Sequence, residues 1–204
     1  MIAIINYGSG NIAAIANIYK QLRIPYLICD QASDLAQAER YILPGVGAFD
    51  ATMQHLASSG MLDVLVQEVV GHGKKVLGIC VGMQILAESS EEGSLSGLGW
   101  IAGKVKKIDA SRLVASPRLP HMGWNSIHLQ ADNPLFRGID VERGFYFLHS
   151  YYFAASDPAS VLATVSYGDE LPCAVGRGNV YGLQFHPEKS HSNGMAIFRN
   201  FAEI

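Results

Sequence analysis

Short apolar runs alternate with helical patterns along the first half of the chain, and this rhythm is the strongest constraint on its fold. Four runs are apolar and rich in strand-forming side chains: residues 2–6, 26–29, 41–43 and 76–79. Between the first two runs, apolar residues recur at helical spacing from Ile12 to Leu22. Strands that alternate with helices are typical of βαβ units. The pattern therefore predicts a parallel sheet covered by helices.

From about residue 100 the pattern changes to strand-like runs separated by Gly, Pro, Asp and Asn. These runs are residues 100–108, 124–129, 144–153, 161–167 and 179–185. A last helical pattern covers residues 194–201. A chain of 204 residues fits one domain and can bury a substantial core. We therefore expect a single mixed α/β domain over residues 1–204, with mostly strands in its second half.

The composition is that of a globular protein and argues against several classes of function. Apolar residues make up 49% and charged residues 16%, and the net charge of -3 gives no basic surface for nucleic acid. No apolar stretch is long enough to span a membrane, so we expect a cytoplasmic protein. The three cysteines are widely spaced and form no CxxC pair. We predict no metal and no cofactor, and we expect a reducing compartment.

The segment 76–84 has the pattern of a nucleophile elbow. A buried-strand run enters Gly78-Ile79-Cys80-Val81-Gly82, and a helical pattern follows through Ala87. An elbow needs small residues two before and two after the nucleophile, because the turn brings other backbone close to both positions. A helix N-terminus also favours a thiolate. Cys80 is thus a candidate nucleophile, although a buried cysteine with no chemical role fits the same short motif.

A thiolate nucleophile needs a histidine to move protons and a carboxylate to orient the ring. Of the seven histidines, His186 stands out because it ends a strand-like run and is followed by Pro187 and Glu188. Proline favours an extended residue before it, and positions i and i+2 of an extended chain point to the same side. His186 and Glu188 can therefore form a base and its orienter, while a structural histidine beside an exposed glutamate is the alternative.

An oxyanion intermediate needs N–H donors that are already in position. One candidate is the N–H of Val81, directly after the nucleophile. The other is the loop at residues 43–47, Leu-Pro-Gly-Val-Gly, at the end of a predicted strand. Glycine lets backbone approach a ligand closely. This loop is common by itself, and its significance comes from its combination with the elbow and with His186.

Three segments together resemble the triad (class I) glutamine amidotransferases over essentially the whole chain: PGVG at 44–47, GICVGMQ at 78–84 and HPEKS at 186–190. The resemblance implies a flavodoxin-like three-layer α/β fold with a mainly parallel central sheet, a nucleophile elbow and extra antiparallel strands in the C-terminal half. It also implies that Cys80 attacks the side-chain amide of glutamine, that His186 transfers protons and that Glu188 orients His186.

The resemblance further implies which residues bind glutamine and the oxyanion. The oxyanion hole would consist of Val46, Gly47 and Val81. The glutamine pocket would be lined by Gly47, Gln84, His149, Ser150 and Tyr151. Without the resemblance, a histidine such as His149 within an aromatic strand would be interpreted as a core residue.

Segments 6–11, 120–125 and 145–152 are similar to the glutaminase subunits of imidazole glycerol phosphate synthases. This similarity implies a heterodimer with a separate (βα)8-barrel cyclase, which uses the ammonia to make imidazole glycerol phosphate and an aminoimidazole carboxamide ribotide in histidine biosynthesis. It places five residues at the interface: Asn11, Met122, Trp124, Tyr146 and Lys189. Two positions depart from the pattern, Asn6 in place of aspartate and Val81 in place of leucine, and Asn6 leaves the role of loop 6–11 open.

Other classes of function fit parts of the sequence. Residues 8–13 match the G-x-G-x-x-A pattern of dinucleotide-binding folds, and Asp30 follows the next strand. A free-standing thiol hydrolase would take Asp157 or Asp169 as its acid. Further alternatives are the glutaminase of another triad amidotransferase and a non-catalytic interaction protein. The basic stretch within 104–118 is interpreted as a solvated face.

Overall fold

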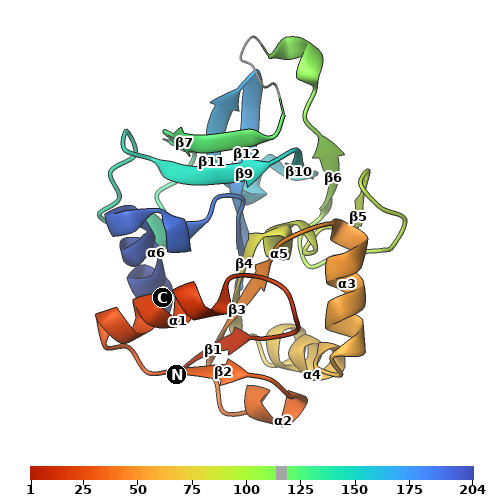
Figure 1. The fold of residues 1–204 in the computed structure, drawn as a ribbon, viewed down its shortest axis with the longest axis vertical. Helices are drawn as coiled ribbons and strands as arrows, with labels where there is room; N and C mark the ends of the chain where they lie inside the picture. The colour runs from red at the N-terminus through yellow and green to blue at the C-terminus, as the bar shows by residue number, and fades with distance from the viewer. Residues whose placement is uncertain (114–118) are drawn as a thin grey trace.

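The structure, a computed structural model, describes residues 1–113 and 119–204. Its centre is an eight-stranded sheet with the order β2-β1-β3-β4-β13-β12-β11-β8 (Figure 1). The strands are β1 (Ile2–Ile5), β2 (Tyr26–Cys29), β3 (Arg40–Gly45), β4 (Lys75–Cys80), β8 (His128–Leu129), β11 (Val161–Tyr167), β12 (Asp169–Arg177) and β13 (Val180–Leu183). The first five in the sheet order are parallel, and the remaining three are antiparallel. The predicted mainly parallel sheet is confirmed.

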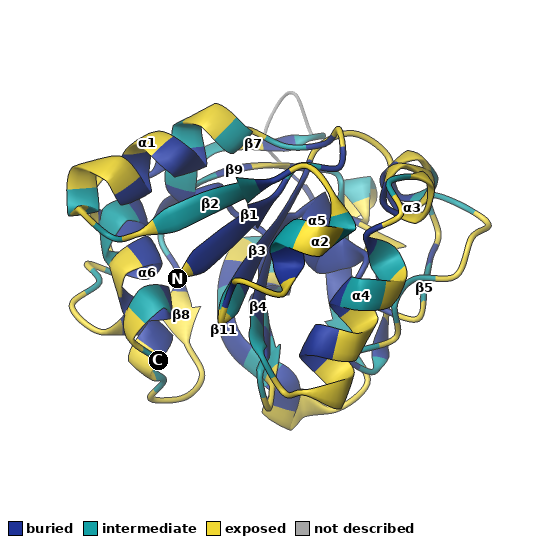
Figure 2. Cartoon of the chain, turned by 90° about the horizontal axis from the view of Figure 1, so that it is seen from below, coloured by how far each residue is buried: buried dark blue, intermediate teal, exposed yellow. Residues whose placement is uncertain are grey.

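Helices cover both faces of the parallel part of the sheet, α1 and α6 on one side and α3 and α4 on the other (Figures 1 and 2). The helices are α1 (Ile12–Leu22), α2 (Ala32–Leu35), α3 (Phe49–Ser58), α4 (Leu62–Val66), α5 (Val81–Gln84) and α6 (His191–Glu203), with a π-helical turn η1 (Gln67–Gly71) and 3-10 turns η2 (Ala110–Arg112), η3 (Pro134–Phe136), η4 (Pro158–Ser160) and η5 (Pro187–Lys189). In the described residues no helix is both long and apolar enough to cross a membrane.

The first helix illustrates why the predicted rhythm produces these layers. The Asn11 side chain accepts a hydrogen bond from the Ala14 N–H at 3.4 Å and so caps the start of α1. The apolar spacing then places Ile15, Ile18 and Tyr19 on one buried face of the helix. The strands beneath, β1, β3 and β4, are almost fully buried, as Figure 2 shows. Burial of both faces explains why these strands are continuous apolar runs.

Two smaller sheets lie beyond the carboxyl ends of the parallel strands. One has the order β10-β6-β5 and contains β10 (Tyr151–Ala155), β6 (Gly103–Lys107) and β5 (Ser89–Ser90). The other pairs β7 (His121–Asn125) with β9 (Phe145–His149) in antiparallel register, so that His121 lies opposite His149 and Trp124 opposite Tyr146. These strands form a wall beside the ends of β3, β4 and β13.

Two details differ from the sequence prediction. The strand β12 was not predicted, because Pro172 and the acidic residues at its start hide the strand pattern, yet it pairs with both β11 and β13. The helix after Cys80 was expected to continue through Ala87 but ends at Gln84. Beyond Gln84 the bonds span three residues in place of four, because the Leu86 N–H donates to Met83 and the Ala87 N–H donates to Gln84.

Candidate active site

The turn from β4 into α5 has the geometry of a nucleophile elbow. Cys80 has φ 56° and ψ -114°, a conformation that non-glycine residues rarely adopt. Gly78 and Gly82 lie where the predicted elbow requires small residues. A side-chain carbon on Gly82 would overlap the Leu43 carbonyl, and one on Gly78 would overlap the Gly82 carbonyl. Backbone from β3 thus packs directly against the turn and holds the Cys80 thiol at the sheet edge.

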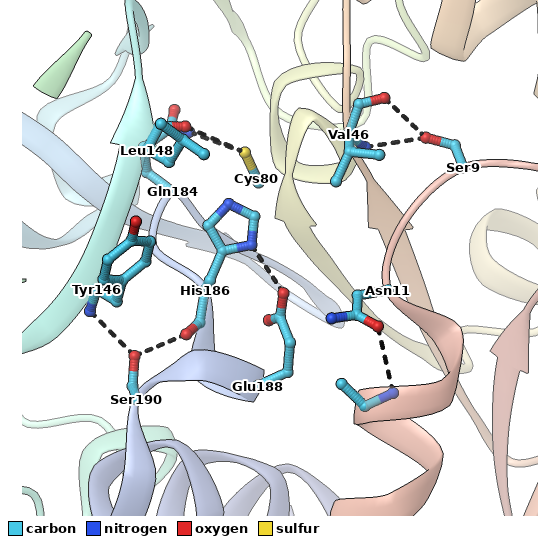
Figure 3. Close-up of polar contacts among 11 residues, drawn as sticks. Ser9, Asn11, Val46, Cys80, Tyr146, Leu148, Gln184, His186, Glu188 and Ser190 are labelled. Atoms are coloured by element: carbon cyan, nitrogen blue, oxygen red, sulfur yellow. Dashed lines mark hydrogen bonds and ion pairs between the residues drawn. The ribbon is translucent and has the colours of Figure 1, made fainter. Parts of the chain in front are cut away.

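His186 and Glu188 lie together beside this turn, as Figure 3 shows. His186 Nδ1 and Glu188 Oε1 are 2.8 Å apart, and the two side chains are only 4% and 3% exposed. Burial by itself lowers the pKa of His186, but hydrogen bonds to Cys80 and Glu188 outweigh it and raise that pKa to about 10. This environment favours the imidazolium form of His186, the form that can donate a proton to a leaving group.

The main chain of His186 is fixed to the neighbouring strand β9. The His186 N–H donates to the Tyr146 carbonyl at 2.9 Å. The buried Ser190 hydroxyl accepts from the Tyr146 N–H at 3.0 Å and donates to the His186 carbonyl at 2.6 Å (Figure 3). These three bonds hold the base against the strand that also forms the pocket wall.

A cavity of about 330 Å³ opens at Cys80. All of the residues expected to bind glutamine or the oxyanion line it: Val46, Gly47, Val81, Gln84, His149, Ser150 and Tyr151. Cys80, His186 and Lys189 also line it. His149 is both buried and part of the cavity wall, and burial lowers its pKa to about 3, so its ring is neutral.

Three residues that line the cavity were not predicted from the sequence: Glu92, Pro120 and Leu148. Of these three, Glu92 is the one with a charged side chain, and its carboxylate is a suitable partner for an ammonium group. It lies in the Gly/Ser-rich loop after β5, and Glu92 Oε2 accepts from the Phe49 N–H at 2.8 Å. No local pattern marks Glu92, since only the folded loop brings it to the cavity.

The predicted oxyanion loop, residues 44–47, is held by the N-terminal loop. Ser9 Oγ accepts from the Val46 N–H at 2.9 Å and lies 3.1 Å from the Val46 carbonyl, to which it donates (Figure 3). The Tyr7 hydroxyl donates to the Pro44 carbonyl. A side-chain carbon on Gly10 would overlap Pro44. Loop 6–11, whose role the sequence left open, thus packs along the whole oxyanion loop.

Of the five residues expected at a partner interface, Lys189 lines the cavity, and the other four lie outside its lining. Met122 and Trp124 on β7 are 60% and 45% exposed. Trp124 stacks on His191 with ring centroids 5.4 Å apart. Lys189 Nζ lies 5.4 Å from the ring centre of Tyr146, which is on the paired strand β9. Asn11, the fifth expected residue, is the exposed cap of α1.

The features that supported other functions have structural partners in this fold. Asp30 accepts a hydrogen bond from the Asn6 side chain at 2.7 Å. This bond ties the start of loop 6–11 to the residue that follows β2. Asp157 caps η4, and Asp169 pairs with Arg112 at 2.7 Å. The carboxylate at His186 is therefore that of Glu188. Of the basic stretch, Lys104, Lys106 and Lys107 are exposed on β6, and Arg118 lies outside the described residues.

Among the described residues, no group of three or more His, Cys, Asp or Glu side chains is arranged to hold a metal ion. The three free cysteines differ in environment. Cys29 and Cys173 are fully buried, and burial raises the pKa of Cys29 to about 11 and that of Cys173 well above its usual value. Of the three, only Cys80 opens onto the cavity.

The sequence matches the class-I glutamine amidotransferase family over residues 3–204, and the chain belongs to this family. It is 50% identical over 204 residues to imidazole glycerol phosphate synthase subunit HisH of Bdellovibrio bacteriovorus, and 48% identical over 204 residues to the protein of the same name from Leptospira borgpetersenii, with 100% of each chain covered. The predicted family and its glutaminase activity are confirmed.

Solved structures share the fold at low sequence identity. A GMP synthase component of Thermoplasma acidophilum has a TM-score of 0.72 at 21% identity and covers 99% of this chain and 92% of its own. A second structure, described as a glutamine amidotransferase, has a TM-score of 0.71 at 21% identity and covers 100% and 99%. The predicted fold class is confirmed.

Proposed function

We propose that this chain is the glutaminase subunit of an imidazole glycerol phosphate synthase and that Cys80, His186 and Glu188 are its catalytic triad. The observation that carries the proposal is the His186 ring, whose Nδ1 lies 2.8 Å from Glu188 Oε1 and which lines the same cavity as the Cys80 thiol. The HisH names of full-length relatives at 48–50% identity support the assignment to this synthase.

The proposed reaction has two halves. The Cys80 thiolate attacks the side-chain carbonyl carbon of glutamine and forms a C–S bond, and the His186 imidazolium then protonates the nitrogen as the C–N bond breaks and ammonia leaves. In the second half, His186 takes a proton from water as the water adds to the thioester. The C–S bond breaks, glutamate leaves, and the thiolate–imidazolium pair is restored. Glu188 accepts a hydrogen bond from the Nδ1–H of His186 throughout the reaction, so that Nε2 of His186 faces the sulfur.

The cavity has groups for the rest of a glutamine molecule. Gln84, His149, Ser150 and Tyr151 form one wall. We infer that Glu92 binds the α-ammonium group, because one of its oxygens is held by the Phe49 N–H and the other is available at the cavity. A cation bound by a carboxylate that is already fixed in place would select an amino acid over a simple amide.

The partner in this proposal is the (βα)8-barrel cyclase, which forms a heterodimer with this chain. An exposed apolar patch supports docking at the cavity mouth. It consists of Val46, Met122, Trp124 and Leu148, of which Val46 and Leu148 also line the cavity. Cross-strand pairing joins Met122 to Leu148 and Trp124 to Tyr146. A partner seated here would enclose the site where ammonia forms and receive it directly.

We further propose that this partner switches the glutaminase on through the loop 44–47. In the lone chain the Val46 carbonyl accepts from Ser9 Oγ at 3.1 Å, and this bond holds the peptide between Val46 and Gly47 in its present orientation. Gly47 has φ +99° and no atom near the position of an added side chain, so the peptide between Val46 and Gly47 has room to rotate. One missing donor suffices as a switch, because the loss of an oxyanion-hole donor costs about 10² to 10³ in rate.

A glutaminase assay tests these proposals. Turnover is measured for the chain alone, with the cyclase, and with the cyclase carrying a ligand in its own active site. We expect low activity alone and strong activation with the occupied partner. Full activity of the lone chain would refute the switch, and no activation by this cyclase would refute the assigned partner.

We also infer a single amidotransferase domain over residues 1–204, because one sheet takes strands from both halves of the chain. The free cysteines support a cytoplasmic location.

A further inference from the structure

Gln184 contacts the sulfur of Cys80 but belongs to neither the triad nor the oxyanion loop. It directly follows β13 and is fully buried. Its Nε2 lies 3.8 Å from Cys80 Sγ and donates a hydrogen bond to it (Figure 3). The Gln184 main chain is fixed as well, because its N–H donates to the Cys173 carbonyl at 2.8 Å. A buried amide next to a reactive sulfur strongly affects the stability of the thiolate. The amide N–H stabilises the thiolate, whereas the amide oxygen destabilises it.

Gln84 fixes the direction of the Gln184 amide. Gln84 Nε2 donates to the Tyr151 main-chain carbonyl at 3.2 Å and to Gln184 Oε1 at 3.0 Å. Because a carbonyl can only accept, the nitrogen of Gln84 must face Tyr151, and its second hydrogen faces Gln184. The oxygen of Gln184 is therefore engaged by Gln84. Its NH2 group is left for Cys80, so a donor faces the sulfur.

The Tyr151 carbonyl that sets this direction is itself held by a chain of neutral rings. His149 Nδ1 donates to it at 2.8 Å. Burial lowers the pKa of His149 to about 3 and that of His121 to about 4, so both rings carry one proton. His149 Nε2 then accepts from His121 Nδ1 at 3.0 Å, and His121 Nε2 accepts from Asn125 at 3.3 Å. Every donor in the chain meets an acceptor, so reversing any one amide would break its neighbours' bonds.

We propose that Gln184 is a further catalytic residue that stabilises the Cys80 thiolate with a side-chain N–H, and that Gln84 is the positioning residue that turns this N–H toward the sulfur. The inference rests on the proposed role of Cys80 as nucleophile. In the thiol form the Cys80 S–H donates to the Leu148 carbonyl at 3.9 Å. Once the proton has moved to His186, that carbonyl repels the thiolate. The Gln184 N–H then offsets the repulsion from within the buried site.

The test measures how fast iodoacetamide alkylates Cys80 at neutral pH, because only the thiolate reacts. Mass spectrometry of peptides locates the added group and separates Cys80 from Cys29 and Cys173. Gln184→Met keeps a side chain of similar length without the donor. We expect alkylation about tenfold slower or more, the size of one lost charge-assisted hydrogen bond, and a loss of kcat for glutaminase with little change in KM. A rate within twofold of wild type would overturn the proposal.

Two further variants separate the donor from general damage. Gln84→Met should slow alkylation by severalfold, although Gln84 does not touch the sulfur, because the Gln184 amide is then free to reverse. Gln130→Met makes the same chemical change at an exposed side chain that bonds to Thr164, and its rate should equal that of wild type. Equal slowing in all three variants would overturn the proposal.

If the Gln184 variant does not fold, the wild-type protein still provides a test. The side-chain amide of Gln184 is followed by ¹⁵N NMR while Cys80 is blocked with a small disulfide reagent. A shift of one Nε2–H is expected, and no shift would overturn the inference. Loss of glutamine hydrolysis in Cys80→Ala tests the role of the nucleophile separately, so the two ideas can fail independently.

Discussion

Two turns at the ends of neighbouring strands, the elbow after β4 and the loop 44–47 after β3, are held in very different ways. Backbone surrounds the elbow so closely that Gly78 and Gly82 have no room for a side chain, and Cys80 is buried. The oxyanion loop exposes 49% of Val46 and leaves open space at Gly47. We infer that the proposed nucleophile and the N–H of Val81 are fixed by the elbow, whereas the proposed donors of the loop 44–47 are held more loosely. The proposed site thus combines a fixed part, the elbow, with a part that the proposed partner would complete, the loop 44–47.

The largest effect on activity is expected when the elbow loses the sulfur atom of Cys80. Cys80→Ala should abolish glutamine-dependent synthesis by the proposed two-subunit complex and leave ammonia-dependent synthesis intact, since in that proposal the cyclase site is on the partner. Both activities are measured on the same preparation. If Cys80→Ala retained glutaminase activity and Cys29→Ala or Cys173→Ala lost it, the nucleophile would be a different cysteine.

The next effect separates the base from its orienter. His186→Ala removes proton transfer worth about 10² to 10⁴ in rate. Glu188→Gln keeps a hydrogen-bonding group beside the ring and should cost less, because only the charge that supports the imidazolium is lost. Glutaminase turnover of both variants is compared in the complex, with circular dichroism to match their folding. Equal or reversed losses would contradict these roles.

A pair of glycine substitutions tests the comparison directly through stability. Gly82→Ala forces a side-chain carbon against the Leu43 carbonyl and should lower the free energy of unfolding by about 3 kcal/mol. In Gly47→Ala the added side-chain carbon contacts no other atom, but the alanine must adopt a positive φ. This substitution should lower the free energy of unfolding by about 1–2 kcal/mol. Urea unfolding measures both. Gly45→Ala is a poor probe of the loop, because its side chain would strike the elbow at Gly82. If Gly47→Ala lowered the free energy of unfolding as much as Gly82→Ala, the loop would be as tightly packed as the elbow.

The sequence predicted the features that depend on local spacing. Alternating strands and helices, the glycines around Cys80 and the extended His186-Pro187-Glu188 segment all depend on residues within a few positions of one another. Other contacts between distant residues, which neither a motif nor the family resemblance marks, were missed. Glu92, Gln184 and Ser9 act through partners 43, 104 and 37 positions away, respectively, and only packing brings them together. The strand β12 was missed because Pro172 hides its pattern, although it has hydrogen-bonded strands on both sides.

The smallest expected effect concerns the single hydroxyl that holds the loop. Ser9 Oγ bonds to both the N–H and the carbonyl of Val46, so Ser9→Ala removes both ties while Tyr7 still anchors Pro44. Of the two, only the bond to the Val46 carbonyl restrains the peptide between Val46 and Gly47. A net hydrogen bond is worth about 1 kcal/mol, which corresponds to roughly fivefold in the population of that peptide in its rotated state. The lone chain should therefore become about fivefold more active as a glutaminase, and activation by the partner should shrink by the same factor. Ser58→Ala, at the exposed end of α3, is the control and should change neither value. If Ser9→Ala instead lowers basal activity, the Ser9 contact holds the donors in their working position, and the contrast between a fixed elbow and a movable oxyanion loop is wrong.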